Sequence, residues 1–165
     1  MKLPYLPVIS LVLAALCLNS AGLCADTPKY GLAADNRIFA QELVNRLTVQ
    51  NPKLITAGMH CLAPGGSVQT IVASTLNVIG KASDPNDVDV GQQGFTLISP
   101  NPKKSKIGVM MPLHDRSGKL VGALALAFKY RDGDDEVKFL ADAVAIRDRV
   151  AQDIADLPAL FVAVP

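Results

Sequence analysis

A histidine and a cysteine stand side by side at His60-Cys61, and a serine follows at Ser74. Together these residue types could supply a nucleophile and its base. His60 and Cys61 lie in a strand-like stretch, where neighbouring side chains point to opposite faces of the sheet. They therefore cannot form a dyad with each other, and no motif around Ser74 indicates a triad. We expect no enzymatic activity. Cys61 is predicted to be a small core residue, with a reactive thiol or an intermolecular disulfide as the alternative.

Motifs for metals and covalent cofactors are missing from the sequence. The chain contains no C-x-x-C, H-x-x-x-H or C-x-x-C-H pattern, which disfavours zinc sites and covalent c-type haem. Asp84, Asp87 and Asp89 could suggest calcium, but their stretch lacks the closing glutamate of a calcium loop. We therefore expect a solvated acidic loop, no metal and no cofactor.

Hydrophobic periodicity predicts a helix near each end of the domain. Apolar residues recur every three or four positions within Leu32–Val49, and again from Phe139 to Leu157. Acidic residues at 132–136 place negative charge at the start of the second helix, where the helix dipole favours it. Pro158 is expected to end that helix.

Five strand-like stretches lie between the helices, at 54–62, 68–76, 95–99, 106–114 and 119–130. Turn residues at 63–67 and 115–118 join neighbouring stretches, and such tight connections imply antiparallel pairing. Pro112 predicts either an edge strand or a bulge in the stretch 106–114, whereas apolar residues on both faces of 119–130 predict a central strand. Residues 80–94 are polar and predict a long loop, with one helical turn near 87–92. The order indicates an α+β domain with a five-stranded antiparallel sheet.

The N-terminal segment, residues 1–25, has the order of a secretory signal peptide. Lys2 is followed by an apolar run, then by small residues, and Ala25 precedes Asp26 as the cleavage point. The run is shorter than the ~18–20 residues of a spanning helix. Cys24 follows Leu23, which fits a lipoprotein signal poorly. We expect a periplasmic or secreted protein without a transmembrane segment after processing; an uncleaved anchor or a lipid on Cys24 is the alternative.

Removing the signal leaves one domain, residues 26–165, with balanced charge. Lys2 is the only charged residue before Asp26, so the remaining chain has 15 basic and 15 acidic residues. This balance gives no electrostatic reason to expect binding to nucleic acid or to an acidic membrane surface.

Three short segments of the sequence together form a recognisable pattern. They are Ile71-Val72-Ala73-Ser74-Thr75 followed by Ile79-Gly80-Lys81, the stretch 109–118 that ends in Asp115-Arg116-Ser117-Gly118, and Val121-Gly122-Ala123. This pattern resembles the Cache domains, which are extracytoplasmic PAS-like sensor modules. The chain is also similar to a group of small exported stand-alone proteins that carry a His-x-x-Pro-Pro-Gly stretch, at His60-Cys61-Leu62-Ala63-Pro64-Gly65 here.

The resemblance implies a PAS-like fold and an exported, sensor-type module that binds a small molecule without an output domain of its own. In such a fold the sheet face away from the helices is covered by the connection 77–94. His60, Ser74, Lys81 and Asp87 are the expected ligand contacts. Two alternatives stay open for single residues, since His60 could be a hydrogen-bonded structural histidine and Lys81 a solvated one. For the protein, the alternative is an envelope interaction or accessory protein without a ligand, and self-association as a homodimer is a further expectation.

Overall fold

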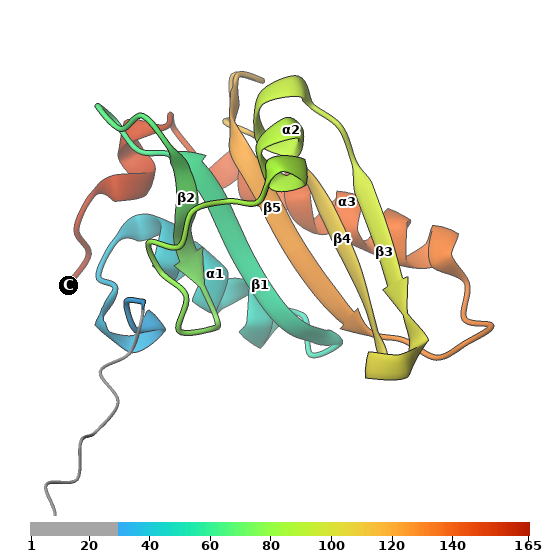
Figure 1. The fold of residues 1–165 in the computed structure, drawn as a ribbon. Coiled ribbons are helices and arrows are strands. Elements are labelled where there is room, and N and C mark those ends of the chain that lie inside the picture. Colours follow the sequence, from blue (N-terminus) through green and yellow to red (C-terminus); the bar gives the residue numbers. More distant parts are fainter. Residues whose placement is uncertain (1–29) are drawn as a thin grey trace, which may run out of the picture.

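A five-stranded antiparallel sheet organises the computed structural model, which describes residues 30–165 (Figure 1). Its strands are β1 (Leu54–Leu62), β2 (Gln69–Ser74), β3 (Leu97–Asn101), β4 (Lys106–His114) and β5 (Leu120–Lys129), arranged in the order β2-β1-β5-β4-β3. The predicted fold class is therefore confirmed, as is the central position of β5. The predicted signal peptide, residues 1–25, lies outside the described residues.

Two long helices cover one face of the sheet, and a short one lies on the other (Figure 1). The helices α1 (Phe39–Gln50) and α3 (Glu136–Asp153) pack on β1, β2 and β4, whereas α2 (Pro85–Gln93) packs over β5, β4 and β1. Short 3-10 turns complete the chain: η1 (Ala33–Asp35), η2 (Pro102–Lys104) and η3 (Pro158–Phe161). Within residues 30–165, no helix combines the length and apolar character needed to cross a membrane.

The hydrophobic core lies between the sheet and the helix pair α1 and α3. Alternate residues of the strands face it, because successive side chains of a strand point to opposite sides. The fully buried contributors from the strands include Met59, Cys61, Ile107, Met111, Leu113, Leu124 and Phe128. The residues between them in sequence therefore face the side of α2, and these include the polar residue His60.

Of the two alternatives that Pro112 predicted for β4, the edge position was wrong, whereas a register shift does occur close by, between Leu113 and His114. The strand lies between β5 and β3, which pairs with it only from Lys106 to Met110. Pro112 lies beyond this stretch and faces only Ala123 of β5. A proline is tolerated there because the strand has a partner on one side alone. The edges of the sheet are β2 and β3.

The polar segment 80–94, between β2 and β3, contains a longer helix than the single turn that the sequence predicted. Pro85 occupies the first turn of α2, and Gly94 ends the helix with a left-handed backbone (φ +79°). Both positions suit these residues, since proline has a helical φ and glycine tolerates a positive one. Val90 is the only buried residue of this helix, so the sequence lacks the repeated apolar positions that would predict a helix here. At the other end of the chain, α3 stops at Asp153, before the proline expected to end it.

Candidate ligand-binding site

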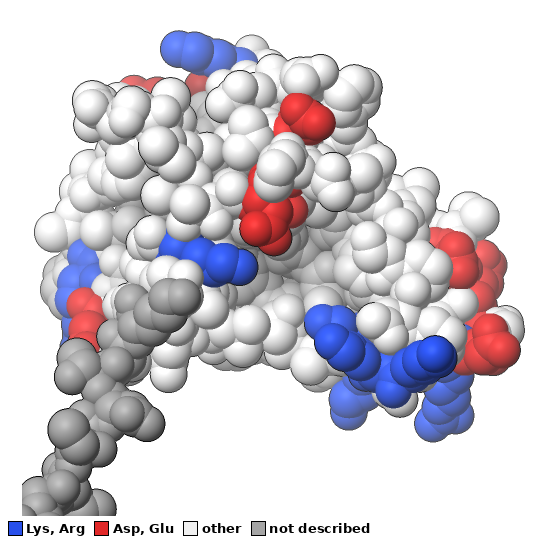
Figure 2. Space-filling view, in the orientation of Figure 1, with Lys and Arg blue, Asp and Glu red and all other residues white. Residues whose placement is uncertain are grey.

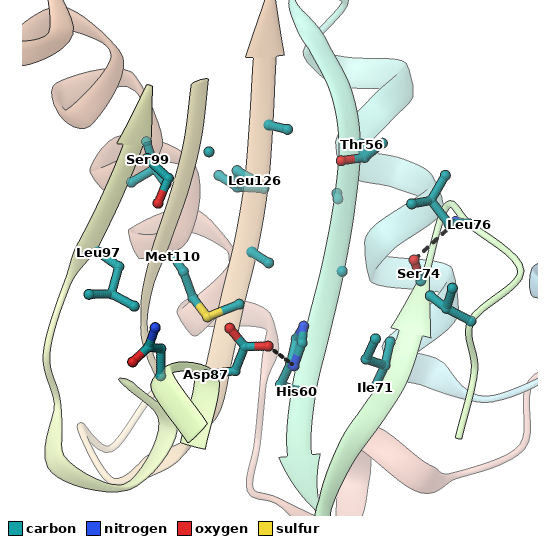
Figure 3. A pocket seen from close by; sticks show the side chains of 18 residues that line it. Thr56, His60, Ile71, Ser74, Leu76, Asp87, Leu97, Ser99, Met110 and Leu126 are labelled. Atoms are coloured by element: carbon teal, nitrogen blue, oxygen red, sulfur yellow. Dashed lines mark hydrogen bonds and ion pairs between the residues drawn. The ribbon is translucent and has the colours of Figure 1, made fainter. Parts of the chain in front are cut away.

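A hollow of about 340 Å³ opens on the free face of the sheet, between the strands and α2 (Figure 3). This is the face away from α1 and α3, where the sequence predicted a pocket beneath the connection 77–94. In the space-filling view, acidic side chains lie over α2 beside the recess (Figure 2). Its volume is at the small end of the range for ligand pockets.

The floor of the hollow consists of small residues that face one another across three strands. Gly58 of β1 pairs with Ala125 of β5, and Ala127 of β5 pairs with Gly108 of β4. Larger side chains flank these four positions, with Thr56 and Ser74 on one side and Met110, Leu97 and Ser99 on the other. Because the strands lie about 4.8 Å apart, this gives a floor of small residues about 10 Å wide.

The polar end of the hollow is built around His60, whose side chain faces α2 (Figure 3). Its Nδ1 lies 2.9 Å from Ser83 Oγ and 3.6 Å from Asp87 Oδ2. The residue is only 6% exposed. This burial lowers the pKa of His60 from its ordinary value, although Asp87 and Asp84 raise it and Lys81 lowers it further. At neutral pH the imidazole is therefore uncharged.

Asp87 is held in place by the start of α2. Its Oδ2 accepts a hydrogen bond of 3.4 Å from the backbone N–H of Asp84, the N-cap residue. The buried Gln69 of β2 donates from Nε2 to the Asp87 carbonyl at 2.9 Å and lies against Gly91 of the same helix. A Cβ at Gly91 would come within 2.5 Å of Gln69 Oε1, so the glycine allows this close approach.

Ser74 lies at the other side of the hollow, at the end of β2. Its backbone N–H and C=O bond to the side chain of the buried Gln41 of α1, both at 2.9 Å. Its hydroxyl oxygen accepts from the backbone N–H of Leu76 at 3.0 Å. These contacts fix the Ser74 side chain in the hollow, where its hydroxyl hydrogen is available for another acceptor.

The structure thus brings three of the four predicted contact residues together: His60, Ser74 and Asp87 line the same hollow. Lys81 is half-buried on the segment beside β2, close enough to influence His60 electrostatically, and it is not among the lining residues. The sequence pattern missed the small floor residues and Asn86. Glycines inside strands, at Gly58 and Gly108, were the available signal, since they often mark a close approach by another group.

Cys61 lies on the opposite face from His60, as predicted. It is fully buried in the core, and burial raises the pKa of its thiol to about 12. Such a thiol is protonated and inert in the folded protein. Within the described part of the chain, no three histidine, cysteine, aspartate or glutamate side chains are grouped so that they could hold a metal ion.

No protein-family model and no curated protein matches the sequence. Solved structures match the fold. The GAF domain of A. aeolicus nlh2, crystallised in an inactive state, has a TM-score of 0.53 at 13% identity, over 72% of this chain and 86% of that chain. A structure from Burkholderia vietnamiensis described as a GAF sensor protein has a TM-score of 0.50 at 16% identity, over 81% of both chains. The chain therefore has the α+β fold of GAF domains, a PAS-like fold family.

Proposed function

We propose that this protein is an exported, sensor-type module that binds a small molecule in the hollow beneath α2. The observation that carries the proposal is the floor itself. Four neighbouring positions on three strands, Gly58, Ala125, Ala127 and Gly108, leave the space above them open. Side chains of ordinary size would have filled it, since protein interiors are usually close-packed.

The fold supports the proposal by analogy. One of the two similar structures is described as a sensor protein. Since one fold serves many functions, this likeness alone does not establish the activity. It does agree with the Cache resemblance of the sequence, because both concern PAS-like sensor modules. We further propose that the module acts in the periplasm or outside the cell and that another protein relays its signal.

We propose a binding function without catalysis. The thiol of Cys61 is protonated and lies on the far side of the sheet from the hollow. His60 and Ser74 line the same hollow, and the hydrogen bonds found for their side chains join them to Ser83 and Leu76 respectively. Ser83 is the hydroxyl within hydrogen-bond reach of His60, and it is not among the residues that line the hollow, so it would not meet a ligand held there.

The proposal is tested by filling the hollow without disturbing the protein. A Cβ at Gly108 would have its nearest neighbour, Ser99, at 3.9 Å, which is an ordinary contact. Gly108→Val should therefore fold and occupy the floor. Ala82→Val adds comparable bulk at an exposed position outside the hollow and serves as the control.

The measurement is thermal unfolding of these proteins with a panel of small amines, amino acids, organic acids and haem. We expect at least one compound to raise the Tm of the original protein and of Ala82→Val but not of Gly108→Val, because binding to the native state stabilises it. The proposal would be contradicted if no compound raised the Tm of the original protein, or if a compound raised the Tm of Gly108→Val by the same amount.

An envelope interaction without a ligand is the second candidate. The outer edge of β3 is the surface that favours it, since Ile98 is 40% exposed there. Pro100 in the same strand protects this edge from pairing with a strand of another chain, so the exposed Ile98 side chain is the contact to test. Analytical ultracentrifugation distinguishes the two: a concentration-dependent dimer that Ile98→Lys abolishes would favour this second function.

A further inference from the structure

Among the residues that line the hollow, Asp87 is the only one with a formally charged side chain, and this negative charge selects among ligands. Asp87 brings a carboxylate to the end of the hollow, and its second oxygen points away from His60 (Figure 3). Among the described residues, no lysine or arginine forms an ion pair with Asp87, and Lys81 does not line the hollow. The negative charge of Asp87 is therefore not neutralised by a cation in the hollow, although its Oδ2 accepts from the Asp84 N–H.

His60 contributes a second acceptor. Its Nδ1 faces Ser83 Oγ and the Asp87 carboxylate, and a carboxylate favours the tautomer that carries the hydrogen on Nδ1. The other ring nitrogen, Nε2, then has a free lone pair. Figure 3 shows this nitrogen turned away from Asp87, and the described residues place no hydrogen-bond partner on it.

The remainder of the hollow is mostly apolar, although Thr56, Ser74, Ser99 and Asn86 also line it. Its floor is formed by glycine and alanine, and its walls include Ile71, Leu76, Val78, Leu97 and Met110. Such a surface favours a planar apolar group that lies against the sheet, because burial of apolar area drives binding. At one end of this surface lie the carboxylate of Asp87 and the unpaired Nε2 of His60.

We infer that the ligand is a small, flat organic cation, in which an amine, amidine or related N–H group faces Asp87 and His60 while an apolar ring covers the floor. This inference rests on the proposed function, since it requires that the hollow binds a ligand. It excludes carboxylates and phosphates as preferred ligands, because Asp87 repels them and no cation lines the hollow to compensate.

Three probes of nearly the same shape test the inference: benzamidine carries a positive charge, benzamide is neutral and benzoate is negative. Each is titrated at neutral pH into the full-length protein, and the backbone amide signals of Gly58, Gly108 and Ala125 are followed by NMR. We expect all detectable shifts to centre on these floor residues. Benzamidine should bind at least about tenfold tighter than benzoate, which corresponds to about 1.4 kcal/mol.

A matched pair of variants isolates the carboxylate. Asp87→Asn removes the charge inside the hollow but keeps an oxygen that can accept from the Asp84 N–H. Asp89→Asn removes the same charge from the same helix outside the hollow, where Asp89 accepts from Gln93. Asp87→Asn should weaken benzamidine binding about tenfold and leave benzamide unchanged, whereas Asp89→Asn should leave both within about twofold.

The outcomes separate the charge assignment from the binding function. If benzoate or benzamide binds the floor as tightly as benzamidine, or if Asp87→Asn leaves benzamidine binding unchanged, the cation assignment is overturned while the proposed function stands. If benzamidine shifts none of the floor amides at millimolar concentration, the cation assignment also fails. The Gly108→Val comparison on the wider panel then decides the proposed function by itself.

Discussion

Gly122 of β5 lies close against the end of β1. A Cβ at this position would lie 2.3 Å from the carbonyl oxygen of His60 and 2.7 Å from the sulfur of Cys61. The first of these neighbours is backbone and cannot move aside as a flexible side chain would. The glycine of the Val121-Gly122-Ala123 segment, which contributed to the Cache resemblance, is thus explained by strand packing beneath the site.

We therefore expect Gly122→Ala to destabilise the protein by about 2–3 kcal/mol, the upper range for added bulk in a packed region. Urea unfolding measures the change. Gly108→Ala is the control, because its Cβ meets nothing closer than 3.9 Å and should change stability by less than about 1 kcal/mol. Equal stabilities of the two variants would contradict the explanation.

Asp115 is the second residue whose role follows from its contacts. Its Oδ1 accepts from the backbone N–H groups of Ser117 and Lys119 and from the Ser117 hydroxyl, at 2.9, 3.0 and 2.6 Å. The Ser117 hydroxyl is the largest of the influences that lower the pKa of Asp115. The charged carboxylate thereby stabilises the turn between β4 and β5.

This lowered pKa fixes the direction of a pH effect. The folded protein binds the Asp115 proton less readily than the unfolded chain does, so the stabilisation is present above the ordinary aspartate pKa and is lost as the pH falls through the folded value. We expect Asp115→Ala to lower the Tm at pH 7 and to lose less stability than the original protein on acidification. Asp115→Asn, which keeps an acceptor oxygen, should fall between them at pH 7. Parallel Tm profiles for all three proteins would refute this role.

At the scale of elements, α2 is the part of the fold that defines the site. It begins directly after the segment that pairs with β2, and its contacts to Gln69 and His60 hold it above the sheet. Its own sequence is polar, with a single buried residue, Val90. The position of this helix therefore depends on a few specific contacts more than on apolar burial.

Removing one of these contacts should loosen α2 alone. Gln69→Ala deletes the hydrogen bond to the Asp87 carbonyl and leaves space beside Gly91. We expect faster amide hydrogen exchange across residues 85–93, with β1 and β5 unchanged, because local opening requires only the lost contacts. Gln92→Ala, at an exposed position of the same helix, is the control. Unchanged exchange in Gln69→Ala would show that the contact does not hold the helix.

At the scale of the whole molecule, the local features of the fold could be predicted from the sequence, whereas those that depend on strand pairing could not. Alternation of apolar residues predicted the bounds of β1 and β4 and placed His60 and Cys61 on opposite faces, because strand geometry is local. The position of β4 within the sheet was missed, since Pro112 indicates a missing partner on one side without saying how far the neighbouring strand extends. The floor of the hollow was missed because it depends on the register between strands. Gly58 and Ala125 are far apart in sequence and meet only through pairing.

Residues 1–25 predict that the whole protein is exported from the cytoplasm. If the segment is a cleaved signal peptide, the protein produced in a bacterium should accumulate outside the cytoplasm with Asp26 as its first residue. Intact-mass measurement of the purified protein checks this. A product that retains residues 1–25, or a mass increase from a lipid on Cys24, would refute cleavage after Ala25.

The central claim is that the hollow beneath α2 holds a small molecule. The most direct test is an experimental structure of the protein purified from the cells that naturally make it. We predict density for a small flat molecule above Gly58, Ala125 and Ala127, with a polar group toward His60 and Asp87. A hollow that contains only water, or that α2 has closed by packing onto the floor, would contradict the claim.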